Sequence, residues 1–144
     1  MDIINRIIHA LTELHPIHAM FVHFPIALTG SAFLFVLLAW WRNNKTLELT
    51  AYYNMILAAI STFFAGATGV YDNNLNYDGE APFAPVKIIL GLTLSVLSVA
   101  LVLTRRKKPD LFEKSRFMYV LVYGICFGIA LVLGFLGGAI LYGF

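Results

Sequence analysis

Three of the four histidines in this chain lie close together, where its first long apolar segment begins. The stretch HPIHAMFVHFPIAL, residues 15–28, contains His15, His18 and His23 together with two prolines. A neutral imidazole is the usual protein ligand for the iron of haem b, and it also binds zinc and copper. We therefore treat His23, His18 and His15 as the candidate cofactor ligands of the chain.

The spacing of these histidines limits how they can cooperate. On a helix with about 100° per residue, His15 and His18 lie about 60° apart and could chelate one ion. His18 and His23 lie about 140° apart and could not share an ion without rearrangement. A haem on His23 would need its second ligand from the N-terminal segment, from Met20 or from another subunit, or would have none.

The alternative is a structural role for His23. Its ring could hydrogen-bond the backbone carbonyl freed by Pro25, the hydroxyl of Thr62 or the carboxylate of Asp72. An ionisable group inside a membrane span usually marks a functional site, but His23 is shallow enough to be wetted. The sequence favours the structural role over a haem site, and a haem site over a small metal site, so no firm metal ligand is predicted.

The other polar residues do not form a recognisable catalytic set. Asp72 and Lys87 are expected beside the histidines at the outer face, as polar support. No nucleophile and base stand at the spacing of a known hydrolase or metalloprotease. The centres of the apolar segments carry only Ser, Thr, Asn54 and Cys126, which disfavours a transporter. We expect neither an enzyme nor a nucleic-acid-binding protein.

Membrane-spanning helices must position these residues. Of 144 residues, 60% are hydrophobic and 12% are charged, about half the charged fraction of a soluble domain. Four apolar segments are long enough to cross a hydrocarbon core of about 30 Å. The sequence predicts an all-α integral membrane four-helix bundle that forms a single domain over residues 1–144. Its spans are expected at about 19–41, 49–71, 85–104 and 117–144.

A separate amphipathic helix is predicted for residues 2–14. Isoleucine and leucine recur on one face of this segment, and polar residues occupy the opposite face. The segment is too short to span, so we expect it to lie in the membrane interface with its apolar face toward the lipid.

The basic residues predict the orientation. Eight of the ten Lys and Arg residues lie in the two loops after the first and third spans. Cytoplasmic loops carry such an excess, so both termini should be extracytoplasmic. We expect a multi-pass protein of the cell membrane (an inner or plasma membrane), in contact with the lipid bilayer.

Small residues mark helix faces that another helix could approach closely. Contacts with partner membrane subunits, or with a second copy of the chain, are expected at the glycines of the second and fourth spans: Gly66, Gly69, Gly124, Gly128, Gly134 and Gly138.

The stretch HPIHAMFVHFPIAL resembles the signature of a family of four-span membrane proteins, domain of unknown function 2231. The segments ATGVYD (67–72) and GGAILYG (137–143) are also similar to this family. The resemblance implies a four-helix membrane domain and, for some members, a haem or redox association. Members often carry a histidine near the start of the third span, where this chain has Lys87, and a Tyr and a His beyond the Gly-Gly element, where it ends at Phe144. These departures weaken a scheme in which two spans each donate a ligand.

Two functional hypotheses follow. The first is a non-enzymatic accessory subunit of a larger membrane complex, for example an electron-transfer complex. The alternative is a redox membrane protein that binds haem b with His23 as axial ligand and with His15 or His18 in support. The two hypotheses are compatible with each other.

Overall fold

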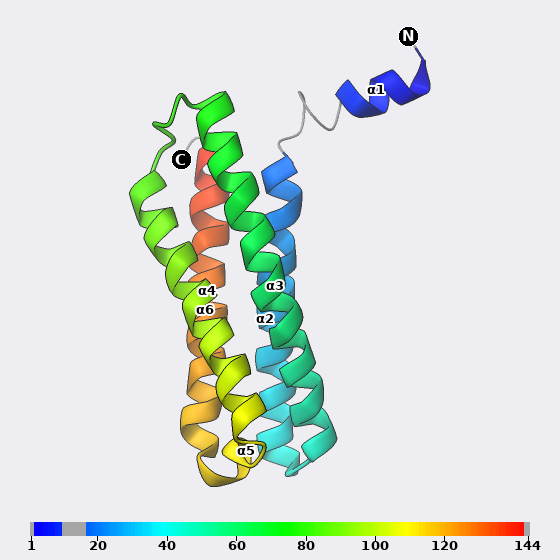
Figure 1. Ribbon diagram of the computed structural model, residues 1–144, viewed down its shortest axis with the longest axis vertical. Coiled ribbons are helices and arrows are strands. Elements are labelled where there is room, and N and C mark those ends of the chain that lie inside the picture. The colour runs from blue at the N-terminus through cyan, green and yellow to red at the C-terminus, as the bar shows by residue number, and fades with distance from the viewer. Residues whose placement is uncertain (1, 10–16, 143–144) are drawn as a thin grey trace.

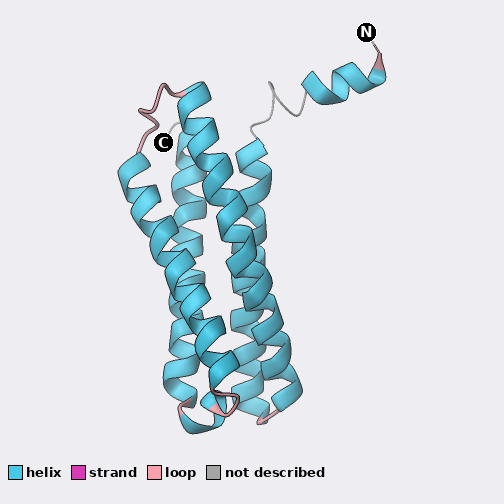
Figure 2. Cartoon of the chain, in the orientation of Figure 1, coloured by secondary structure: helices cyan, strands magenta, loops and turns pink. Residues whose placement is uncertain are grey.

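The computed structural model describes residues 2–9 and 17–142, and this part of the chain contains helices and short loops without strands (Figure 2). Four helices are long and apolar enough to cross a membrane, which confirms the prediction of an all-α four-helix bundle. The helices are α1 (Ile3–His9), α2 (Ile17–Arg42), α3 (Lys45–Asn76), α4 (Ala84–Lys107), α5 (Leu111–Lys114) and α6 (Arg116–Tyr142).

The four long helices form a closed ring. Helix α2 packs against α3 and α6, and α4 packs against the other sides of α3 and α6. Short connections make sequential helices antiparallel, so the α2–α3 loop and α5 lie at one end and the α3–α4 loop lies at the other (Figure 1). Each end of the bundle therefore collects residues that are far apart in the sequence.

Helix α1 stands apart from the bundle in Figure 1. Its isoleucines Ile3, Ile4, Ile7 and Ile8 are between 53% and 71% exposed. An exposed apolar face is what a helix in the membrane interface would present to lipid. The second half of the predicted segment 2–14 lies outside the described residues, and the interfacial placement stays a prediction.

The packed interior is made largely of small side chains. Ala32, Ala39, Ala51 and Ala58 are completely buried, and small residues allow helix backbones to approach closely in a membrane. Only 17–33% of the residues in the most apolar part of each span are buried within the chain. The remaining apolar surface faces outward, as a lipid-exposed bundle requires.

Local sequence determines where the helices begin. The side chain of Asn44 caps α3 by accepting hydrogen bonds from the backbone N–H groups of Thr46 and Leu47, at 2.8 and 3.2 Å. Helix α4 begins after Phe83, which has a left-handed φ of 59°, and Pro85 occupies its first turn, where a missing N–H costs nothing.

The loop between α3 and α4 is shorter than the polar segment 72–83 suggests, because α3 continues to Asn76. Asn73 holds the loop in place. Its side-chain oxygen accepts from the N–H of Ala81 at 2.9 Å, and its amide nitrogen donates to the carbonyl of Gly79 at 3.1 Å. This end of the bundle is therefore an ordered turn, and Asp72 lies on helix α3 before it.

Helix α2 runs without interruption through Pro25. The carbonyl of Pro25 accepts a hydrogen bond from the hydroxyl of Thr29 at 2.6 Å, a typical way for Thr to satisfy backbone groups in a membrane helix. The helix that carries His18 and His23 is thus continuous, and the two rings keep the relative directions that helical spacing gives them.

Candidate functional site

His23 lies on the exposed surface of α2. Its Nδ1 is 2.5 Å from the carbonyl oxygen of Ala19, one helical turn earlier. Because a carbonyl can only accept, Nδ1 carries the proton and Nε2 presents a lone pair. This hydrogen bond is the kind that fixes the tautomer and orientation of a metal-ligating imidazole.

His18 is held between α2 and α3 instead. The Thr68 hydroxyl donates to the carbonyl of Phe64 at 2.8 Å, so its oxygen accepts from Nδ1 of His18, 3.2 Å away. A Cβ built on Gly69 would lie 2.9 Å from the His18 ring. The ring therefore fills the space beside Gly69 on α3, and it forms a contact between α2 and α3.

Asp72 in α3 and Lys87 in α4 lie near His18, at the end of the bundle that carries the α3–α4 loop. Both charges are within electrostatic range of the His18 ring, although the described residues include no salt bridge between them. Asp72 instead accepts a hydrogen bond from Asn76 at 2.7 Å. The two residues thus give His18 a polar surrounding without forming a compact charged pair.

The described residues contain no group of three His, Cys, Asp or Glu side chains that could hold a metal ion. His15, the third candidate ligand, lies outside the described residues. The ring of His23 is exposed, and the hydrogen bond that it makes within the described residues uses Nδ1 and not Nε2. His18 does not complete a pair with it, since its ring is engaged with Thr68 on α3.

A second polar cluster lies at the opposite end of the bundle. Glu48 in α3 and Arg105 in α4 are 1% and 7% exposed, and they form a bidentate pair. Nε and Nη2 of Arg105 donate to the two carboxylate oxygens at 2.7 and 2.9 Å. The hydroxyl of Tyr119 in α6 donates to the same carboxylate at 2.7 Å and lies 3.1 Å from the hydroxyl of Tyr123.

This cluster joins three of the four long helices. The guanidinium of Arg105 also lies 5.4 Å above the ring of Tyr52, and the ring of Phe112 in α5 meets Tyr119 edge-on with centroids 5.7 Å apart. Every buried side-chain nitrogen and oxygen in the described part of the chain has a hydrogen-bond partner. The ion pair is fully hydrogen-bonded and flanked by aromatic rings, and it fixes the positions of α3, α4 and α6 relative to one another.

Sequence reasoning did not identify this cluster. Glu48 and Arg105 stand in polar, basic loop segments, where a charge usually faces water. The available signal was their position on the helices. Glu48 lies in the first turn of α3 and Arg105 in the last turn of α4, where each complements the helix dipole.

The glycines divide into two sets. Four positions pack inside the chain: Gly30 and Gly124 lie against aromatic rings of the neighbouring helix, Gly134 against Ile26, and Gly69 against His18. A Cβ added at Gly66, Gly128 or Gly138 would meet nothing within 4 Å. On α6, Gly124 and Gly134 therefore pack against α2, whereas Gly128 and Gly138 have open space where a side chain would stand.

A family model described as "Predicted membrane protein (DUF2231)" matches residues 14–144. No curated protein and no solved structure matches the chain significantly. The matched range includes the histidine-rich start of α2 and all four long helices.

Proposed function

The chain belongs to the family of predicted membrane proteins DUF2231, and we propose that it is a non-enzymatic accessory subunit of a larger membrane complex. The observation that carries the proposal is the set of outward glycines. Gly66 on α3 and Gly128 and Gly138 on α6 leave open space where a side chain would stand. Such positions let a helix of another subunit approach the backbone closely.

The buried polar residues, which bond to one another, support the same function. The buried charges, Glu48 and Arg105, neutralise each other, and the Tyr119 hydroxyl is bonded to the same carboxylate. A general acid or base must instead be free to meet a substrate. Electron-transfer complexes are one class that such a subunit could join.

Co-purification with partners tests the proposal. We expect Gly66→Leu and Gly128→Leu to release partner subunits, because the new side chains start from positions where a Cβ meets no other part of the bundle within 4 Å. Ala100→Leu is the matched control, since Ala100 is exposed on α4. Gly134→Leu is unsuitable for this test because a Cβ there lies 2.8 Å from Ile26 and would disturb the bundle. Retention of all partners by the doubly substituted chain would overturn the proposal.

A second candidate function rests on His23. We propose, as the alternative, a b-type haem site in which His23 provides an axial ligand and a neighbouring subunit or the N-terminal segment provides any further contact. The supporting observation is the 2.5 Å hydrogen bond from Nδ1 to the carbonyl of Ala19, which leaves Nε2 of this exposed ring available to a ligand. Bound haem would supply one-electron redox chemistry.

An absorption spectrum tests the haem site. The chain purified from haem-replete cells should show a Soret band that disappears in His23→Ala. His18→Ala is the control, because His18 bonds to Thr68 within the bundle, and the band should remain in that variant. A colourless preparation of the wild-type chain would rule out the haem site without affecting the accessory role.

A further inference from the structure

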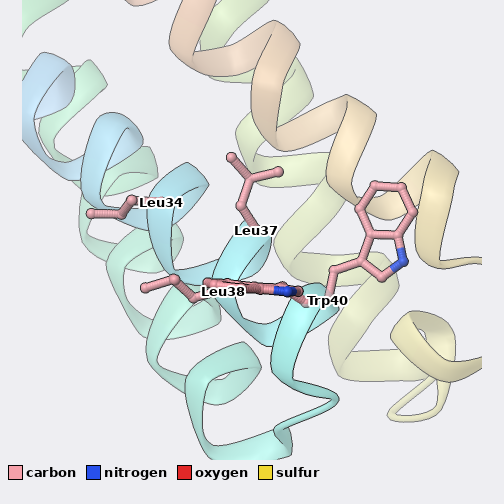
Figure 3. Close-up of a pocket in the computed structure, with 5 residues that line it drawn as sticks. Leu34, Leu37, Leu38 and Trp40 are labelled. Atoms are coloured by element: carbon pink, nitrogen blue, oxygen red, sulfur yellow. The ribbon is translucent and has the colours of Figure 1, made fainter.

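A shallow apolar groove lies along α2, near the end that carries the α2–α3 loop (Figure 3). Two tryptophans help to line it, and they are the only tryptophans in the chain. Trp41 is 81% exposed and Trp40 is 42% exposed. All the residues that line the groove come from this one helix: Leu34, Leu37, Leu38, Trp40 and Trp41.

The groove ends at a positive charge. The guanidinium of Arg42, the last residue of α2, lies 6.0 Å from the centroid of the Trp41 ring. Within the described residues Arg42 has no ion-pair partner, whereas Lys45, the first residue of α3, is paired with Glu113 at 3.2 Å. Arg116, which faces this loop from α6, is hydrogen-bonded to Asn43 at 2.5 Å. Of the three cations that flank the α2–α3 loop, Arg42 is therefore the one without an ion pair or side-chain hydrogen bond to the described residues.

We infer that the groove binds an anionic phospholipid, with an acyl chain along the leucines and the phosphate at Arg42. The apolar floor matches a hydrocarbon chain, and tryptophans at the end of a span lie at the depth of lipid headgroups. Arginine binds phosphate with several donors at once. Charge complementarity selects an anionic lipid over a zwitterionic one, because a juxtamembrane cation attracts a net negative headgroup.

The two tryptophans make the inference directly testable. The full chain is placed in phosphatidylcholine bilayers that contain a small fraction of lipid brominated on its acyl chains, which quenches tryptophan on contact. Brominated phosphatidylglycerol should be enriched at the groove about fivefold over brominated phosphatidylcholine, the preference that one nearby cation gives. Free phosphate cannot produce this signal, since the bromine is on the acyl chain.

Variants locate the site. The preference for phosphatidylglycerol should disappear in Arg42→Gln and persist in Arg42→Lys, because only lysine keeps the positive charge. Arg42 is exposed, so neither change disturbs the core. Arg106→Gln is the matched control, since Arg106 is an exposed cation at the end of α4, and it should leave the preference intact. Equal quenching by the two brominated lipids, or a preference that survives Arg42→Gln, would overturn the inference.

Discussion

At Glu48, three donors converge on one buried carboxylate: Nε and Nη2 of Arg105 and the hydroxyl of Tyr119. Removing one partner of a buried ion pair leaves the other charge without compensation, whereas replacing both partners by apolar side chains of similar size avoids that penalty. The packing of α3, α4 and α6 therefore depends on the ion pair between Glu48 and Arg105.

This dependence gives a prediction for stability. Arg105→Met and Glu48→Leu should each lower the free energy of unfolding by about 3–5 kcal/mol, because each leaves a lone buried charge. The double variant should cost much less than the sum of the two. Denaturant unfolding of the chain in detergent micelles measures all three values. If the losses of the two single variants added up in the double variant, Glu48 and Arg105 would not be coupled and the prediction would be wrong.

The residue scale is also where sequence reasoning reached least far. Glu48 and Arg105 are 57 residues apart, and no local pattern reports which of several neighbouring charges turns inward. That choice depends on the rotation of two helices about their axes. The different directions of the His23 and His18 side chains could be predicted in part, because helical spacing alone separates them by about 140°.

At the scale of elements, α3 presents two different glycine faces one turn apart. Gly69 receives the ring of His18, and Gly66 opens outward. The two positions are alike in sequence, since each follows an alanine or a threonine in an apolar helix. The two glycines differ only in what packs against them. The sequence therefore predicted close packing at both positions, but it could not show that Gly69 contacts His18 and that a Cβ at Gly66 would meet nothing within 4 Å.

A matched pair of substitutions tests this difference. Gly66→Ala should stabilise the isolated chain by about 0.5–1 kcal/mol, because alanine suits a helix interior better than glycine. Gly69→Ala should be less stable than Gly66→Ala by about 1–3 kcal/mol, because its Cβ displaces the His18 ring and crowds the α2–α3 contact. Thermal unfolding of the two variants in the same detergent compares them, and equal midpoints would contradict the packing of His18 on α3.

The whole molecule has a charge asymmetry between its ends. Eight of the ten Lys and Arg residues lie at or beside the α5 end, and the α3–α4 loop at the other end carries Asp78 and Glu80 (Figure 1). Length and apolar content were enough to predict four spans, because the need to cross about 30 Å of hydrocarbon acts on each segment separately. The same charges support our proposal that the α5 end faces the cytoplasm and both termini face outward.

Cysteine labelling tests this orientation. Cys126, the single cysteine, is completely buried and should not react. In intact cells a membrane-impermeant maleimide should label Glu80→Cys, and it should label Lys108→Cys only after the membrane is opened. The reverse pattern would show that the chain is inserted the other way round.

The central claim is that this bundle works as part of a larger membrane assembly. The most direct measurement is the composition and mass of the particle that is extracted from native membranes into lipid nanodiscs without detergent. We predict other polypeptides in fixed stoichiometry with the 16.0 kDa chain, and their loss when Gly66 and Gly128 are both changed to Leu. A particle that contains this chain alone, as a monomer or as a homo-oligomer, would contradict the claim.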